Sequence, residues 1–268
     1  MNKGLFIIGV VVFAGVFAEF IAKDPYRVDM SNRLLSPSLE HFFGTDQLGR
    51  DLFSRVVYGA RTSLFLAVSI TIISMIFGSL FGAVSGYFGG IIDDVFGRII
   101  DIFLSIPDLV LNIALVGILS LSYGTSPLII IFSIAFTNWV SYARIVRGSV
   151  LSIKEHEFVL AAKAIGASNL YILRKHIIPN IIGPVIVLAT LNVGNVIIAI
   201  SSLGFLGLGI QPPTPEWGEI LNSGKNYLET APWIMLFPGF AIAVTVLGFN
   251  IFGEGLRDVL DVKKEIIE

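Results

Sequence analysis

The sequence from Leu64 to Tyr87 reads LFLAVSITIISMIFGSLFGAVSGY and carries no charged side chain. A helix needs about 20 apolar residues to cross a bilayer core of roughly 30 Å. Comparable apolar windows recur along the chain, whereas the alternating strands of about 10 residues that build a membrane β-barrel are missing from the sequence. The stretch therefore predicts an all-α integral membrane protein.

The composition agrees with a membrane protein. The chain is 54% hydrophobic and 14% charged, with a mean hydropathy of +0.84. Soluble domains carry about 25% charged residues, and the 21 phenylalanines with long Ile, Val and Leu runs exceed what one globular core buries. The sequence holds no cysteine, which excludes disulfides, thiolate metal ligands and cysteine nucleophiles.

Six membrane spans are predicted, at residues 4–22, 64–87, 99–119, 128–146, 181–203 and 233–253. They divide the chain into a first helix with an extracytoplasmic segment (1–63), a five-helix core (64–253) with a charged loop at 147–180, and a polar tail (254–268). A short link is expected at 88–98 and a Pro/Gly-rich segment at 204–232. Lys3 followed by Leu5–Phe17 also fits a signal peptide, but the apolar run continues to Ala22 without a small-x-small cleavage site, which favours an uncleaved span.

The distribution of Lys and Arg predicts the orientation in the membrane. With the N-terminus inside, eleven of the 18 Lys and Arg residues fall on the inner side. Several of the outer ones lie deep in the long segment 23–63, where the positive-inside rule weakens. Both termini are therefore expected in the cytoplasm, in a multi-pass protein of a bacterial or archaeal cell (inner) membrane.

Two patterns inside the spans bear on packing and on transport. Small residues recur every four positions in the second span, which favours close helix packing over a pore-lining role; they are Ser74, Gly78, Gly82, Gly86 and Gly90. Asp101 and Asp108 flank Pro107, about two turns apart and so on roughly one face of the third span. Intramembrane carboxylates suggest a functional site, although Asp101 can equally pair with Arg98. Polar points that either bond across helices or line a passage are Asn112, Asn138, Asn192, Asn195 and Asn250, and from these and the carboxylates we take Asp108, Asn192 and Asn195 as possible pathway or gate residues.

The loop between the fourth and fifth spans predicts two short helices. Residues 157–165 are rich in helix formers, and Gly166 can end that helix. Ser168 can cap a second helix, Asn169–His176, which should stop before Pro179. One face of the first helix is apolar by its spacing and should meet either a protein groove or the bilayer surface; it carries Phe158, Ala161, Ala162 and Ile165.

This loop resembles the ATPase-docking loop of binding-protein-dependent ABC importer permeases. That pattern is two alanines, three residues, a glycine, and a proline thirteen residues later, and Ala161, Ala162, Gly166 and Pro179 match it. Leu160 and His176 depart from the general pattern in the manner of the peptide and nickel importers, as do the runs Glu157-Phe158-Val159 and Lys175-His176-Ile177-Ile178-Pro179-Asn180. The resemblance implies that Glu157, Phe158, Ala161, Ala162, Gly166 and Pro179 couple this subunit to an ATPase.

Two further segments resemble the C-type subunit of dipeptide, oligopeptide and nickel importers. They are Phe43-Gly44-Thr45-Asp46-Gln47-Leu48-Gly49-Arg50-Asp51 and Gly204-Phe205-Leu206-Gly207-Leu208-Gly209 with the following Gln211-Pro212-Pro213 and Pro215-Glu216-Trp217-Gly218. The residues themselves suit either ordinary turns that close the outer ends or a gate or binding-protein contact. Asp46, Arg50, Asp51 and Arg55 can form a salt-bridge cluster there.

The resemblance implies the type I ABC importer permease (MetI-like) fold and a set of partners. These are a second similar membrane subunit, two cytoplasmic ATPase subunits that bind ATP and Mg, and an extracytoplasmic solute-binding protein. The chain has no Gly-x4-Gly-Lys-Ser/Thr phosphate loop, and His41, His156 and His176 show no metal-ligand spacing, so we expect a transporter subunit and no enzyme, cofactor or metal site. Peptides, nickel or metal chelates are the solutes implied, with the short stretch before the first span leaning slightly to nickel. An ion-gradient-driven secondary transporter is the alternative.

Overall fold

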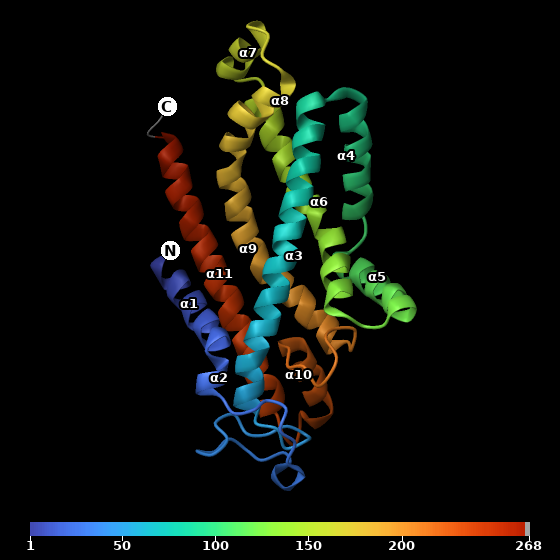
Figure 1. Cartoon of the computed structure of the whole chain (residues 1–268), viewed down its shortest axis with the longest axis vertical. Helices are drawn as coiled ribbons and strands as arrows, with labels where there is room; N and C mark the ends of the chain where they lie inside the picture. The colour runs from blue at the N-terminus through green and yellow to red at the C-terminus, as the bar shows by residue number, and fades with distance from the viewer. Residues whose placement is uncertain (266–268) are drawn as a thin grey trace.

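The computed structural model describes the backbone of residues 1–265 and the side chains of residues 1–260. In this range the chain is an elongated bundle of helices, with α7 at one end and residues 22–51 at the other (Figure 1). The helices are α1 (Asn2–Val16), α2 (Ala18–Ile21), η1 (Met30–Asn32), α3 (Leu52–Phe88), α4 (Gly90–Leu104), α5 (Asp108–Tyr123), α6 (Pro127–Ile153), α7 (Glu157–Ala164), α8 (Asn169–Ile172), η2 (Leu173–Ile177), α9 (Ile178–Phe205), α10 (Trp217–Gly224), η3 (Lys225–Tyr227) and α11 (Trp233–Glu265).

Four helices in the described range are long and apolar enough to cross a membrane. They are Leu52–Phe88, Pro127–Ile153, Asn169–Phe205 and Trp233–Leu260, and the α4–α5 pair adds a fifth if it counts as one bent span. The first predicted span is shorter than expected, because α1 ends at Val16 and α2 restarts at Ala18. The all-helical membrane architecture is therefore confirmed, and its sixth crossing stays a prediction.

The third predicted span is broken. α4 and α5 meet at an angle of 89°, and Pro107 stands at the break as the N-cap of α5. A proline lacks the N–H that would continue the helix and disfavours a helical residue before it. Asp101 and Asp108 consequently lie on two different helices, so the expectation that they share one face is wrong. The expected link at 88–98 is likewise mostly helix, because α4 begins at Gly90.

The small residues of α3 form its contact with α6, as predicted. A Cβ added to Gly78 or Gly82 would clash with the backbone carbonyl of Trp139 or Ala143 on α6, and one on Gly86 would lie 2.9 Å from the carbonyl of Arg147. Such close approach of two backbones is what small residues permit in lipid. The pattern stops at Gly86, because Gly90 belongs to α4 and meets nothing within 4 Å.

A buried charge cluster closes the end opposite α7. Arg50 Nε lies 2.6 Å from Asp46 Oδ2 and Arg55 Nε lies 3.5 Å from the same oxygen, which confirms part of the predicted cluster. Asp51 instead caps α3, accepting from the Ser54 N–H at 2.9 Å, and pairs with His41 at 2.9 Å. The cluster thereby ties the start of α3 to the folded segment 23–51.

The same cluster reaches α10. Arg55 Nη2 donates to Glu219 Oε2 at 2.6 Å, and the indole of Trp217 donates to the Val56 carbonyl at 2.9 Å. Gly204 and Gly218 allow α9 and α10 to touch, since a Cβ on Gly204 would lie 2.8 Å from the backbone of Gly218. Gly204 and Gly218 thus act in the packing of α9 on α10.

Candidate functional site

The loop at residues 154–177 lies at one extreme of the molecule, with α7 as its outermost helix (Figure 1). α7 ends at Ala164, and Gly166 follows with a φ of +82°, a conformation that strains residues with a Cβ. Ser168 then caps α8, its hydroxyl accepting from the Tyr171 N–H at 3.3 Å. The first helix, its glycine stop and the second cap are therefore as predicted.

The residues predicted to share one apolar face of α7 lie on two faces of the helix. Ala162 points inward with Val159, and both are buried in a cluster with Ile172, Ile177 and Val150. Outward lie Phe158, 42% exposed, and Ile165, 86% exposed. The predicted stripe is therefore split, because Ala162 anchors the loop while the other apolar side chains remain uncovered.

The second short helix does not stop before Pro179, and that expectation is wrong. α8 passes directly into the π-helix η2 and then into α9, so Asn169–Phe205 is one continuous helix. Pro179 lies inside this continuous helix, two residues after η2, and local π-helical turns are one way in which a membrane helix tolerates a proline. The loop helix α7 is therefore attached to a rigid rod that runs through the bundle.

Tyr87 at the end of α3 holds the loop from below, and the sequence analysis did not single it out. Its hydroxyl bonds to Asn169 Oδ1 at 2.9 Å, and the Lys163 ammonium lies 5.6 Å from its ring centroid. The rings of Phe158 and His176 also lie near each other in this loop, tilted by 42° with their centroids 5.9 Å apart. The sequence did offer one signal for Tyr87, because it is an aromatic residue at the end of an apolar span, next to a loop.

The predicted pathway residues do not form one cluster. Asn192 on α9 is buried and donates to the Tyr142 hydroxyl on α6 at 3.1 Å. Asp108, at the start of α5, and Asn195, on α9, are both exposed. Asn112 is also a packing residue, since Thr137 donates to its side chain at 2.8 Å.

A charged pocket lies between α4 and α6, with a volume of about 410 Å³. Arg147 Nη2 donates to Asp93 Oδ2 at 2.7 Å, and Ser85 Oγ donates to the same carboxylate at 2.6 Å. The alternative pairing of Asp101 with Arg98 is not among the ion pairs of the described residues. Asp93 escaped the sequence analysis because residues 88–98 were taken for a link.

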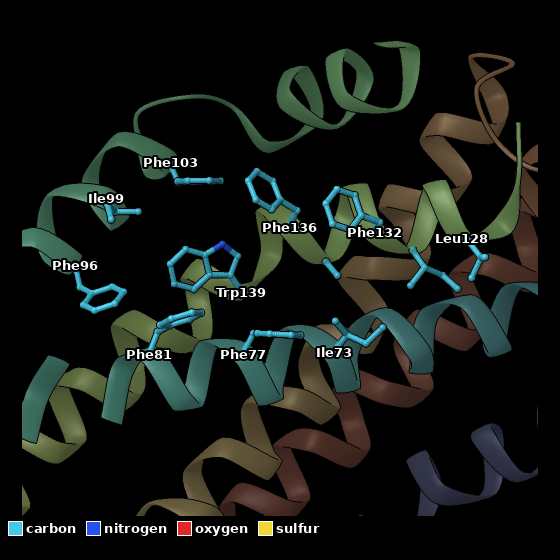
Figure 2. Close-up of a pocket in the computed structure, with 12 residues that line it drawn as sticks. Ile73, Phe77, Phe81, Phe96, Ile99, Phe103, Leu128, Phe132, Phe136 and Trp139 are labelled. Carbon is cyan, nitrogen blue, oxygen red and sulfur yellow. The ribbon is translucent and has the colours of Figure 1, made fainter. Parts of the chain in front are cut away.

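A second pocket is an apolar groove of about 730 Å³, which is lined by residues of α3, α4 and α6. All of its lining residues are apolar, and Figure 2 shows aromatic rings from the three helices turned into the same space. The labelled rings belong to Phe77, Phe81, Phe96, Phe103, Phe132, Phe136 and Trp139. A charged solute would be desolvated without compensation in such a groove.

Comparison with solved structures shows the fold. A chain of the MetNI methionine ABC transporter, solved in inward-facing conformations, matches with a TM-score of 0.57 at 22% identity, covering 78% of this chain and 97% of that chain. The described bundle therefore has the MetI-like permease architecture.

Curated relatives match almost the whole chain. The dipeptide transport system permease protein DppC of Alkalihalophilus pseudofirmus is 46% identical over 97% of this chain and 84% of its own length. The probable D,D-dipeptide transport system permease protein DdpC of Escherichia coli is 42% identical over 96% of this chain and 85% of its own, and the oligopeptide transport system permease protein OppC of Bacillus subtilis is 39% identical over 97% and 84%. The model of the binding-protein-dependent transport system inner membrane component matches residues 78–265. The chain belongs to this family, and it is a membrane-embedded permease subunit of an ABC importer rather than an enzyme.

Proposed function

We propose that this permease subunit forms half of the translocation pathway for dipeptides or oligopeptides. The names of the relatives support the peptide alternative, since they refer to dipeptides, D,D-dipeptides and oligopeptides. Nickel, which the sequence analysis left open, has no such support. The secondary-transporter alternative is set aside with the family assignment.

The proposed assembly contains a second homologous permease subunit, two cytoplasmic ATPase subunits that bind ATP and Mg, and an extracytoplasmic solute-binding protein. In the proposed topology α1 with α2 completes six crossings of the cell membrane, and both termini and α7 lie in the cytoplasm. Residues 1–63 then supply the first helix and the outer segment, residues 64–253 the core, and residues 254–268 the tail. Asp108 and Asn195 are candidates for the solute path because both are exposed, and Asn192 holds α9 on α6 behind it.

The coupling role is supported by how the loop packs on the bundle. Val159 and Ala162 fasten α7 to the bundle, while Phe158 and Ile165 are left facing outward. Exposed apolar side chains grouped in one place mark a protein or membrane contact, and the family assignment favours a protein. Because α8 continues into α9, a displacement of α7 by a partner would move a helix that runs through the whole bundle.

The coupling role is tested by Ile165→Asp, with Leu39→Asp as the matched control. Both side chains are almost fully exposed, 86% and 93%, and Leu39 lies in the segment at the opposite end. We expect Ile165→Asp to abolish co-purification of the ATPase and peptide uptake, and Leu39→Asp to retain the ATPase. Retention of the ATPase and of normal uptake by Ile165→Asp would disprove the coupling role.

Two variants test the support of the loop rather than its outer face. Ala162→Asp places a carboxylate in the buried cluster, and Gly166→Pro forces a residue with a fixed negative φ into a position at +82°. Each should abolish uptake while the chain is still inserted in the membrane. Normal uptake by either variant at wild-type expression would contradict the proposed lever.

A further inference from the structure

The charges of α4 lie beside an apolar contact between α4, α6 and α3. Ile100 packs against Val140 and Ala143 of α6, and Ala143 in turn lies against Gly82, inside the uncharged stretch of α3. Asp101 and Arg144, the next residues after Ile100 and Ala143, are therefore level with apolar parts of the bundle. Ionisable groups on membrane helices typically face the bundle interior or a water-filled cavity, and they pair with one another or mark a solute or ion path.

Four of the charged groups around this pocket have no close partner among the described residues. Arg147 and Asp93 satisfy each other and join α4 to α6 and α3. The other two cations and two anions make no ion pair or side-chain hydrogen bond among the described residues, and all four are exposed. They are Arg98, Arg144, Asp94 and Asp101.

The charges that line the pocket and its volume indicate the kind of ligand it would bind. It presents both charges in a space of about 410 Å³, within the range of roughly 300–1,000 Å³ that small-molecule sites occupy. A guanidinium binds a carboxylate with two parallel hydrogen bonds, and a carboxylate accepts from an ammonium group. A zwitterion with separated ends satisfies both halves, whereas the apolar groove of Figure 2 satisfies neither.

We propose that this pocket is a station for the charged ends of a peptide on its way through the subunit, with Arg98 and Arg144 facing the carboxylate and Asp94 and Asp101 the ammonium group. This inference rests on the proposed peptide transport. The four charged side chains are exposed, so each contact is weak. Weak binding suits a conducting path, where a solute must be held and then released.

The test uses the complete importer, with its binding protein and ATPase, in proteoliposomes and a radiolabelled dipeptide with free ends. The quantity measured is the number of peptides transported per ATP hydrolysed. We expect Arg144→Gln and Asp101→Asn each to lower this ratio about fivefold, the effect of one water-screened ion pair, with the binding-protein-stimulated ATPase rate unchanged. Arg144→Lys should recover most of the loss because it keeps the cation, and Lys225→Gln, an exposed cation at the opposite end, should match the wild type.

The outcomes separate the pocket from the proposed function. Unchanged ratios in both variants, or an equal fall for Lys225→Gln, would overturn the pocket while peptide transport stands. A joint fall of uptake and ATPase rate would assign the residues to assembly and would overturn it too. If the wild-type importer took up no peptide, the proposed function itself would be disproved, and the proposed role of the pocket with it.

Discussion

Arg55 is fully buried in the first turns of α3 and contacts three separate parts of the chain. Its guanidinium lies 3.5 Å from Asp46 and 2.6 Å from Glu219, and it donates to the Pro25 carbonyl at 3.3 Å. A cation that joins the outer segment, α3 and α10 in this way fixes the geometry of the whole end of the bundle. Without it, the buried Glu219 would lose its 2.6 Å partner, whereas Asp46 would still contact Arg50.

Arg55→Gln should therefore destabilise the protein by about 3–5 kcal/mol, the cost of removing one partner of a buried pair. Arg61→Gln is the control, because the Arg61–Glu19 pair is 48% and 65% exposed and should contribute about 1 kcal/mol or less. Thermal unfolding in detergent measures both. Equal losses from the two substitutions would show that Arg55 is not the central residue of the cluster.

Glu216 gives this end a pH dependence. Burial raises the pKa of the Glu216 carboxyl above its usual range, although Ser63 and the backbone N–H groups of α10 donate to it. A raised pKa in the folded state means that the folded protein binds the proton more tightly, so stability from this group is lost as the pH rises through that pKa. Burial also raises the pKa of Glu219, with Arg55 opposing the shift.

The comparison of wild type with Glu216→Gln isolates the first group, since glutamine has nearly the same shape and does not titrate. Between pH 8 and pH 5 we expect the wild type to gain thermal stability relative to the variant. Melting curves of both proteins at each pH give the difference. A difference that stays constant over this range, or that changes in the opposite direction, would contradict a raised pKa.

At this scale the sequence predicted local partners and missed distant ones. Asp46, Arg50 and Arg55 are close along the chain, and their clustering followed from spacing. Glu219 is far away in sequence, and its contact with Arg55 depends on where α10 lies. Ala162 was placed on the wrong face of α7 because helical spacing groups residues without telling which side the bundle covers.

At the scale of elements, the contact between α3 and α6 makes the sharpest prediction. Gly82→Ala would force its methyl group into the backbone of Ala143, which should cost about 1–3 kcal/mol as overpacking does. Gly148→Ala on α6 is the control, because nothing lies within 4 Å of its Cβ position. The control should be neutral or slightly stabilising, since alanine is the better helix former.

Unfolding of the two variants in detergent, with uptake measured in parallel, tests this contact. A destabilised Gly82→Ala beside an unchanged Gly148→Ala is the expected pair of results. Equal stability of the two would mean that the helices separate at no cost, and that the small residues serve another purpose.

The elements themselves were predictable to different degrees. Long uncharged runs located α3, α6, α9 and α11, and the recurrence of small residues identified the face of α3 that packs. The bend between α4 and α5 was missed because the hydropathy of a window of residues does not show whether its helix is straight. Pro107, which stands at the bend, was the available signal. The merger of α8 with α9 was missed because Pro179 was taken as a helix stop, whereas the continuous helix accommodates it just after the π-helical turn η2.

At the scale of the whole molecule, the open question is how often the chain crosses the membrane. α1 is about 22 Å long at 1.5 Å per residue, short of a bilayer core of roughly 30 Å, and α2 brings the pair close to that length. α1 packs closely on α11, because a Cβ on Gly248 would lie 2.8 Å from Ile7. A helix fastened in this way to a spanning helix shares its environment, which favours a sixth crossing.

The absence of native cysteine makes single-cysteine labelling a clean test of this topology. We expect a membrane-impermeant maleimide to label Leu39→Cys on intact cells, and to label Asn2→Cys and Lys175→Cys only after permeabilisation, because all three positions are exposed and the last two are proposed to be cytoplasmic. Labelling of Asn2→Cys together with Leu39→Cys would show that α1 and α2 turn back without crossing, which leaves the coupling loop intact. Labelling of Lys175→Cys on intact cells would place that loop outside, and would contradict the docking of an ATPase on α7.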